Sequence, residues 1–208
     1  MKTFKQLRES MQNKKTNTLN VFDIDDTLFR SQAKVLVKKD GKTVRELQSG
    51  EFNTYKLKPG EEHDFSQFRS SQKFHSTAVP IDKMITRAQR AVSTHGSNDK
   101  TIIITARSDF DDKDLFLQTF RNHDFPIDHV YVERAGNLEK YKKGVRTHIT
   151  KGVILRKYLN SGKFTRIRMW DDHKDNLEML IKIGSMYPDI DIQAFLVDPE
   201  TGNTTRFR

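Results

Sequence analysis

Residues 21–28 read VFDIDDTL, in which an apolar run ends abruptly in acidic residues. The preceding residues complete a β-prone segment, TLNVF at 18–22, which predicts a buried strand. Asp23 and Asp25 are two positions apart, so their side chains point to the same side if the extended geometry persists. An acidic helix cap would explain one aspartate but not three acids, whose mutual repulsion predicts a bound cation such as Mg²⁺. One carboxylate is then placed to attack a phosphorus centre.

Further β-prone runs follow along the chain, with helical patterns between them. The runs lie at residues 101–105, 129–133, 164–170 and 192–197, and residues 204–208 are able to fold back as an edge strand. Helices are predicted at 111–123, 150–159 and 174–186, and another opens at Pro80 and stops at Gly96. This alternation predicts an α/β fold, a Rossmann-like three-layer sandwich with a mainly parallel five-stranded sheet.

The segment between the first two predicted strands is longer than one crossover helix requires. Residues 34–47 carry a hairpin signal, with Asp40-Gly41 between two strand-like arms. Residues 50–76 show no sustained period and predict a loop with short pieces of structure. We therefore expect one domain over residues 1–208, with a small hairpin-type insertion at about 31–79 at one edge of the sheet.

Composition narrows the class of protein. The chain has 208 residues and no cysteine, which excludes disulfides and thiolate metal sites. Its first residues are polar and basic, and no stretch approaches the ~20 apolar residues of a membrane span. We therefore expect a cytoplasmic protein without membrane contact. The net charge of +9 favours anionic partners, although solubility alone explains it equally well.

Three groups of polar residues fall at the ends of predicted strands. Besides the acids at 23–25, they are Thr105 and the pair Asp171-Asp172. In an open α/β sheet, ligands bind at the carboxyl ends of the strands, so we expect the groups to share one site. Asp175 follows one helical turn later. Helix capping by Asp172, with Asp175 favoured by the helix dipole, is the alternative.

A hydroxyl and a cation in the sequence suit a bound phosphate. Thr105 ends a predicted strand and precedes Ala106 and Arg107, where a phosphate oxygen would fit, although Thr is also a common β residue. Lys151 is predicted near a helix start, where the dipole disfavours a cation. A bound anion explains this lysine better than helix stability does, and a solvated lysine is the alternative.

Together these motifs resemble the haloacid dehalogenase superfamily of phosphohydrolases. The four motifs of that superfamily match Asp23-Ile24-Asp25-Asp26-Thr27, Thr105, Lys151, and Asp171-Asp172 with Asp175. The resemblance implies that Asp23 is the nucleophile and Asp25 the general acid and later the base. It also implies that Mg²⁺ is held by Asp23, the backbone carbonyl of Asp25 and Asp171, with Asp172 or Asp175 in support. Thr105, Ala106 and Lys151 would bind the phosphoryl oxygens, with Arg107 in support.

This resemblance implies a phosphatase that hydrolyses a phosphomonoester through an aspartyl-phosphate. A small insertion leaves the site open, and the basic loop at 134–151 contains Tyr141. The hairpin adds the cations Lys38, Lys39, Lys42 and Arg45. Cations with an aromatic suit a nucleotide or a nucleic-acid 3′-phosphate end. The chain also resembles the phosphatase domain of polynucleotide kinase-phosphatases and small phage-encoded members of the superfamily. A small-metabolite phosphatase and a non-catalytic module that binds nucleic acid or protein are the alternatives.

Overall fold

The computed structural model describes residues 17–94, 98–139 and 147–208. Its main sheet is built from β1 (Thr18–Phe22), β7 (Lys100–Thr105), β8 (Tyr131–Arg134), β9 (Arg166–Asp171), β10 (Asp191–Val197) and β11 (Thr204–Phe207). The strand order is β11-β10-β9-β1-β7-β8, and only β11 is antiparallel to its neighbour. The mainly parallel α/β sheet is therefore confirmed, and the chain end adds the predicted edge strand as a sixth.

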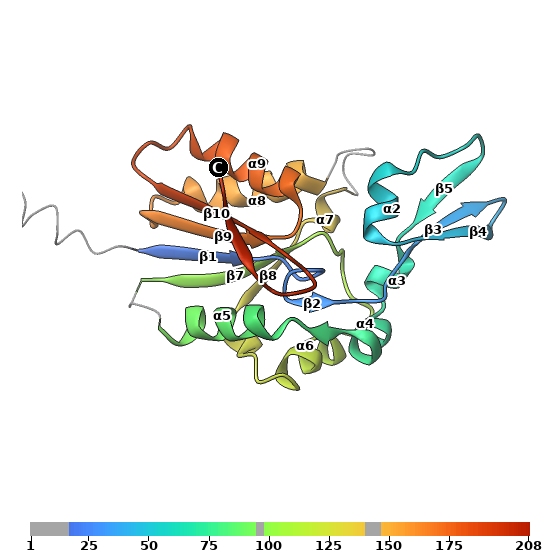
Figure 1. Ribbon diagram of the computed structural model, residues 1–208, viewed down its shortest axis with the longest axis horizontal. Helices are drawn as coiled ribbons and strands as arrows, with labels where there is room; N and C mark the ends of the chain where they lie inside the picture. The colour runs from blue at the N-terminus through green and yellow to red at the C-terminus, as the bar shows by residue number, and fades with distance from the viewer. Residues whose placement is uncertain (1–16, 95–97, 140–146) are drawn as a thin grey trace, which may run out of the picture.

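Helices cover both faces of this sheet (Figure 1). One face carries α5 (Asp82–Ser93) and α6 (Lys113–Arg121), and the other carries α8 (Thr147–Leu159) and α9 (Lys174–Gly184). Two short helices, α7 (Gly136–Glu139) and the 3₁₀ helix at Ile127–His129, border β8. Every residue of β1 is buried, as a central parallel strand requires. Within the described residues, no helix is long and apolar enough to cross a membrane.

Helix boundaries differ from the prediction: α6 and α9 are shorter than the predicted 111–123 and 174–186, and the starts of α5 and α8 also differ. Pro80 does not open α5, because it lies in the two-residue strand β6 (Val79–Pro80), which pairs with β2 (Phe29–Arg30). The predicted stop of α5 at Gly96 lies outside the described residues. Helix α8 begins at Thr147, three residues before its predicted start at 150. Lys151 is therefore inside the helix, so the prediction that it lies at the helix start was wrong.

The insertion holds more regular structure than expected. The predicted hairpin is present as β3 (Val35–Lys39) and β4 (Lys42–Leu47), with Asp40 and Gly41 at positive φ of 51° and 75° in its turn. A third strand, β5 (Glu61–Asp64), pairs with β3, although its sequence EEHD carries no β-prone residue. We call residues 35–64, which include α2 (Ser49–Thr54), the flap. Figure 1 shows the flap projecting beyond the carboxyl ends of the main strands.

Two short helices, α3 (Ser66–Arg69) and α4 (Ser71–Thr77), fasten the insertion to the body of the protein. Phe74 of α4 is fully buried, and its ring lies edge-on to Phe29 and stacks with Phe116 of α6. At the start of α4, the backbone N–H of Ser71 donates to Asp111 over 2.7 Å. This packing of aromatic rings is the main apolar contact between the insertion and the face of the sheet that α5 and α6 cover.

We expect Phe74→Ala to lower the free energy of unfolding by about 3–5 kcal/mol, because the substitution leaves a cavity between α4 and α6. Phe65, the residue that follows the flap, is exposed, with 43% of its surface accessible. The matched variant Phe65→Ala is expected to cost no more than about 1 kcal/mol. Urea unfolding followed by circular dichroism measures both, and equal losses would show that α4 is not fastened by Phe74.

Candidate active site

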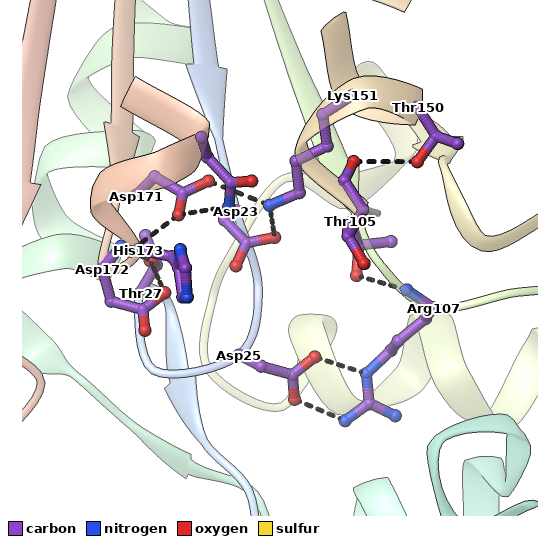
Figure 2. A network of polar contacts seen from close by, with 12 residues as sticks. Asp23, Asp25, Thr27, Thr105, Arg107, Thr150, Lys151, Asp171, Asp172 and His173 are labelled. Carbon is purple, nitrogen blue, oxygen red and sulfur yellow. Dashed lines mark hydrogen bonds and ion pairs between the residues drawn. The ribbon is translucent and has the colours of Figure 1, made fainter. Parts of the chain in front are cut away.

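The predicted site residues meet at the carboxyl ends of three adjacent strands (Figure 2). Asp23 directly follows β1, Asp171 ends β9, and Thr105 ends β7. Because β9, β1 and β7 are neighbours in the sheet, residues far apart in the sequence come together at one edge. The backbone N–H of Asp23 donates to the carbonyl of Trp170 over 3.1 Å, which continues the sheet pairing up to the site.

Lys151 is the cation at the centre of the site. It reaches in from α8 and is 2% exposed. Its Nζ lies 2.9 Å from Asp23 Oδ1 and 2.9 Å from Asp171 Oδ2. Burial by itself would lower the pKa of the Lys151 ammonium, but the charges of Asp171 and Asp23 raise that pKa above its ordinary value. Lys151 therefore stays protonated and offsets the charge of both carboxylates.

Asp171 is fully buried, and all of its polar contacts are within the protein. Besides the ion pair with Lys151, its Oδ1 accepts hydrogen bonds from the backbone N–H of His173 and from Asn176 Nδ2, at 2.9 and 2.8 Å. These contacts hold Asp171 in one orientation, so it fixes the position of Lys151. The sequence reasoning missed Asn176, a buried polar residue beside the apolar residues of α9.

Asp172 completes a compact acidic group. One carboxylate oxygen from each of Asp23, Asp171 and Asp172 lies within 4.8 Å of the others. Thr27 is next to Asp172, whose backbone N–H donates to Thr27 Oγ1 over 3.1 Å. The structure does not bring Asp175 to this group, because its exposed side chain lies 3.9 Å from His148 instead. Of the two acids predicted to support a metal, Asp172 is the one beside Asp23.

Burial and mutual repulsion raise the pKa values of two carboxyl groups in this acidic group. Burial raises the pKa of Asp23 to about 7, with the nearby charge of Lys151 opposing this rise and those of Asp171 and Asp25 adding to it. Burial, together with the charges of Asp171 and Asp23, raises the pKa of Asp172 to about 9. Asp23 Oδ1 is buried and has no hydrogen-bond partner among the described residues, despite its ion pair. Oxygen ligands with an excess of negative charge are those that hard divalent cations prefer.

Asp25 is held apart from this group by Arg107. The guanidinium donates from Nε to Asp25 Oδ2 over 2.9 Å and from Nη2 to Oδ1 over 2.7 Å (Figure 2). Ser31 Oγ donates to the same Oδ1 over 2.8 Å. Arg107 is 2% exposed, and its Nη1 donates to the carbonyl of Phe68 in α3. Arg107, which the sequence placed in a supporting role, thus joins Asp25 to the insertion.

Thr105 and Ala106 form the third side of the site. Thr105 is fully buried, and its Oγ1 accepts a hydrogen bond from the backbone N–H of Arg107 over 3.1 Å. Ala106 is exposed at the end of the strand. Gly136 starts α7 against this turn, where a Cβ would lie 2.3 Å from the Ala106 carbonyl oxygen. Only glycine allows this close approach, which fixes the turn that carries both residues.

The predicted cationic rim is only partly described. Residues 140–146, including Tyr141 of the basic loop, lie outside the described residues. On the flap, Lys38 forms an ion pair with Asp64, and Arg45 lies 3.9 Å from Glu51. Two of the four predicted hairpin cations thus have acidic neighbours, which reduces the positive charge that the flap presents.

We expect Lys151→Met to lower the free energy of unfolding by about 3–5 kcal/mol at neutral pH, because it leaves buried carboxylates without a counter-charge. The matched control is Lys157→Met on the same helix. Lys157 pairs with Glu133, and its own side chain is 69% exposed. That change is expected to cost less than about 1 kcal/mol. Urea unfolding measures both, and similar costs would contradict the central role of Lys151.

Stability of the metal-free protein is expected to fall as pH rises from about 5 to 9. The folded pKa values of Asp23 and Asp172, about 7 and about 9, exceed their ordinary value of 3.8, so the folded state binds more protons between these limits. Their contribution is lost as pH rises through each folded pKa. Urea unfolding in a chelating buffer measures the slope, which Asp172→Asn should reduce at its alkaline end. A flat profile would contradict the raised pKa values.

Comparison with known proteins places the chain in a family. No curated protein matches the chain significantly in sequence. A family model described as "Protein of unknown function (DUF2608)" matches residues 1–197. This match covers nearly the whole chain and includes every residue of the site described above. The chain therefore belongs to the DUF2608 family.

Proposed function

We propose that the chain is a Mg²⁺-dependent phosphatase of the haloacid dehalogenase superfamily. It would hydrolyse phosphomonoesters through an aspartyl-phosphate on Asp23. The observation that carries this proposal is the group of three carboxylates within 4.8 Å of one another beside the buried cation of Lys151. A helix cap or a surface acidic patch has no reason to bury these charges, because burial of charge is costly unless function or pairing compensates it.

The donor set supports a divalent cation. Asp23 and Asp172 would hold it, with Asp171 beside them and the backbone carbonyl of Asp25 as a further oxygen ligand. Asp23 Oδ1 is buried with Lys151 as its one close partner in the described structure, and burial, with the charges of Asp171 and Asp23, raises the pKa of Asp172, so both groups gain from a further positive charge. When bound, Mg²⁺ would lower the repulsion between the carboxylates and the incoming phosphate and polarise its oxygens.

Asp23 would act as the nucleophile. A carboxylate oxygen of Asp23 attacks phosphorus, the bond from phosphorus to the ester oxygen breaks, and the leaving oxygen takes a proton from Asp25. Water then attacks the phosphorus of the aspartyl-phosphate and gives a proton to Asp25. The bond from phosphorus to Asp23 breaks, which releases phosphate and restores the carboxylate. Lys151 and the turn at Thr105-Ala106 would stabilise the charge on the phosphoryl oxygens.

The pair formed by Asp25 and Arg107 bears on this cycle. Both carboxylate oxygens accept hydrogen bonds from the guanidinium, an arrangement that suits the ionised form of Asp25 and therefore the water-activating step. To protonate the leaving oxygen, Asp25 must carry a proton and loosen its contact with Arg107. Since Arg107 also binds the Phe68 carbonyl, movement of the insertion and release of Asp25 would be coupled.

For the substrate, we propose a nucleotide or a nucleic-acid 3′-phosphate end. The net charge of +9 supports an anionic partner, and Lys39 and Lys42 are exposed in the flap beyond the site. The flap carries acidic residues as well, so a small phosphorylated metabolite is the competing substrate class. A second class of function, a module that binds without catalysis, has less support. Such a module has no need for the buried charged residues of the site, and Asp23, Lys151 and Asp171 are all present.

Hydrolysis of p-nitrophenyl phosphate with and without Mg²⁺ tests the proposal. We expect Asp23→Asn to lower kcat by at least about 10³-fold and Asp25→Asn by about 10²–10⁴-fold. Asp175→Asn is the matched control, because this exposed aspartate lies outside the acidic group, and its activity is expected within about twofold of the native value. Absence of Mg²⁺-dependent turnover on every phosphoester of a broad panel would reject the enzymatic proposal.

The same assay with physiological compounds identifies the substrate class. The panel compares 3′-phosphorylated oligonucleotides, mononucleotides and sugar phosphates by kcat/KM. A preference for the first two classes supports the proposed substrate. Activity confined to sugar phosphates would reject it while leaving the phosphatase proposal intact.

A further inference from the structure

A pocket lies away from the carboxylates, between α5 and the amino-terminal half of the main sheet. Its volume is about 380 Å³, and its walls come from β1, β9, the second half of α5 and the segment before β7. The sheet contributes Asn20 and Arg168, which are adjacent in the pairing of β1 with β9. The proposed phosphatase site uses the carboxyl ends of the same strands, so the two sites are separate.

Three arginines make this pocket strongly cationic. They are Arg87 and Arg90 from α5 and Arg168 from β9, against a single acidic lining residue, Asp99. Asp99 Oδ1 accepts a 2.6 Å hydrogen bond from the backbone N–H of Thr18. In the part of the chain that the structure describes, none of the three arginines forms an ion pair within 4.0 Å. Arg87 and Arg168 are half-buried, and their printed partners are uncharged: Arg87 lies 5.9 Å from the centroid of the Trp170 ring, and Arg168 Nε donates to Gln193 Oε1 over 3.1 Å. Half-buried charges without a counter-charge favour a bound anion.

Trp170 adds a hydrogen-bond donor without a partner. This residue lines the pocket, is 5% exposed, and its Nε1 is buried with no hydrogen-bond partner among the described residues. A buried indole N–H normally finds an acceptor. The ring is covered by its neighbours: Phe22 of β1 stacks on it at 4.5 Å, Phe195 of β10 stacks on it at 5.2 Å, and the Arg87 guanidinium lies 5.9 Å from its centroid. A ligand therefore meets the edge of the indole and does not stack on its face.

We propose that this pocket binds a compact, multiply charged oxyanion of the phosphate type. Guanidinium groups match the oxygen geometry of phosphate and pair with it through two hydrogen bonds each. The three arginines are all donors, which a ligand with several acceptor oxygens satisfies together. Inorganic phosphate, pyrophosphate and the terminal phosphates of a nucleotide share this chemistry. The covered faces of Trp170 argue against a ligand that binds mainly through a stacked base.

The pocket and the candidate active site share structural elements. The carbonyl of Trp170 accepts the hydrogen bond from the backbone N–H of Asp23, and Asp171 is the next residue along β9. A ligand at the indole edge thus contacts the strand that positions the acidic group. The binding proposal itself rests only on the pocket and is independent of the phosphatase activity.

The single tryptophan of the chain is Trp170, so its fluorescence reports on this pocket. Native protein is titrated with pyrophosphate, phosphate or ATP in a chelating buffer without divalent cations. We expect a saturable change in fluorescence with at least one of them, and the tightest ligand identifies the source of the anion. The double variant Arg87→Gln/Arg90→Gln is expected to weaken binding by at least about tenfold, since charge-assisted hydrogen bonds are lost.

Arg156→Gln is the matched control, because it removes an exposed arginine from α8, on the other face of the sheet. It should bind with native affinity. Calorimetric titration of Arg90→Gln alone, an exposed side chain whose loss leaves the core intact, is a second measurement and should also show weaker binding. Native affinity in both pocket variants, or no saturable response of the native protein to any of the three anions, would overturn the proposal.

Discussion

One buried ammonium group holds two carboxylates in place: Lys151 Nζ lies 2.9 Å from Asp23 and 2.9 Å from Asp171. The three residues come from α8 and from the ends of two strands that are adjacent in the sheet. Without the cation, the two buried carboxylates would repel one another. The packing of α8 on the sheet and the geometry of the strand ends therefore depend on this ion-pair network. Asp172 adds a third carboxyl group beside this network, and its burial there raises its pKa to about 9.

A second buried cation connects the site to the insertion. Arg107 binds both oxygens of Asp25, the carbonyl of Phe68 and, through its guanidinium, the ring face of Phe74 at 4.5 Å. A planar group with five donors is suited to hold a carboxylate and a carbonyl at once, which a lysine does less well. The proton-transfer residue of the proposed mechanism is thus controlled from the insertion, whereas the proposed nucleophile is controlled from α8. Asp23 and Asp25 are therefore each paired with a different buried cation.

Strands β1 and β9 contribute residues to a polar region at each end of the sheet. At their carboxyl ends they carry acidic residues paired with Lys151, and nearer their amino ends they line a pocket with arginines from β9 and α5. The rings of Phe22, Trp170 and Phe195 stack side by side across three neighbouring strands, and Trp170 also lines the pocket.

The sequence alone determined which segments of the chain form the main-sheet strands and which polar residues end three of them. Periodicity and local composition are sufficient for this, because an apolar run followed by acids is a local pattern. The place of Lys151 within α8, the choice of Asp172 over Asp175 and the third flap strand were decided by tertiary structure. Asp25 and Arg107 are 82 positions apart, and no local pattern encodes their contact. Only the packing of the strands and the insertion sets the distances between such residues, and those distances determine which charges are paired.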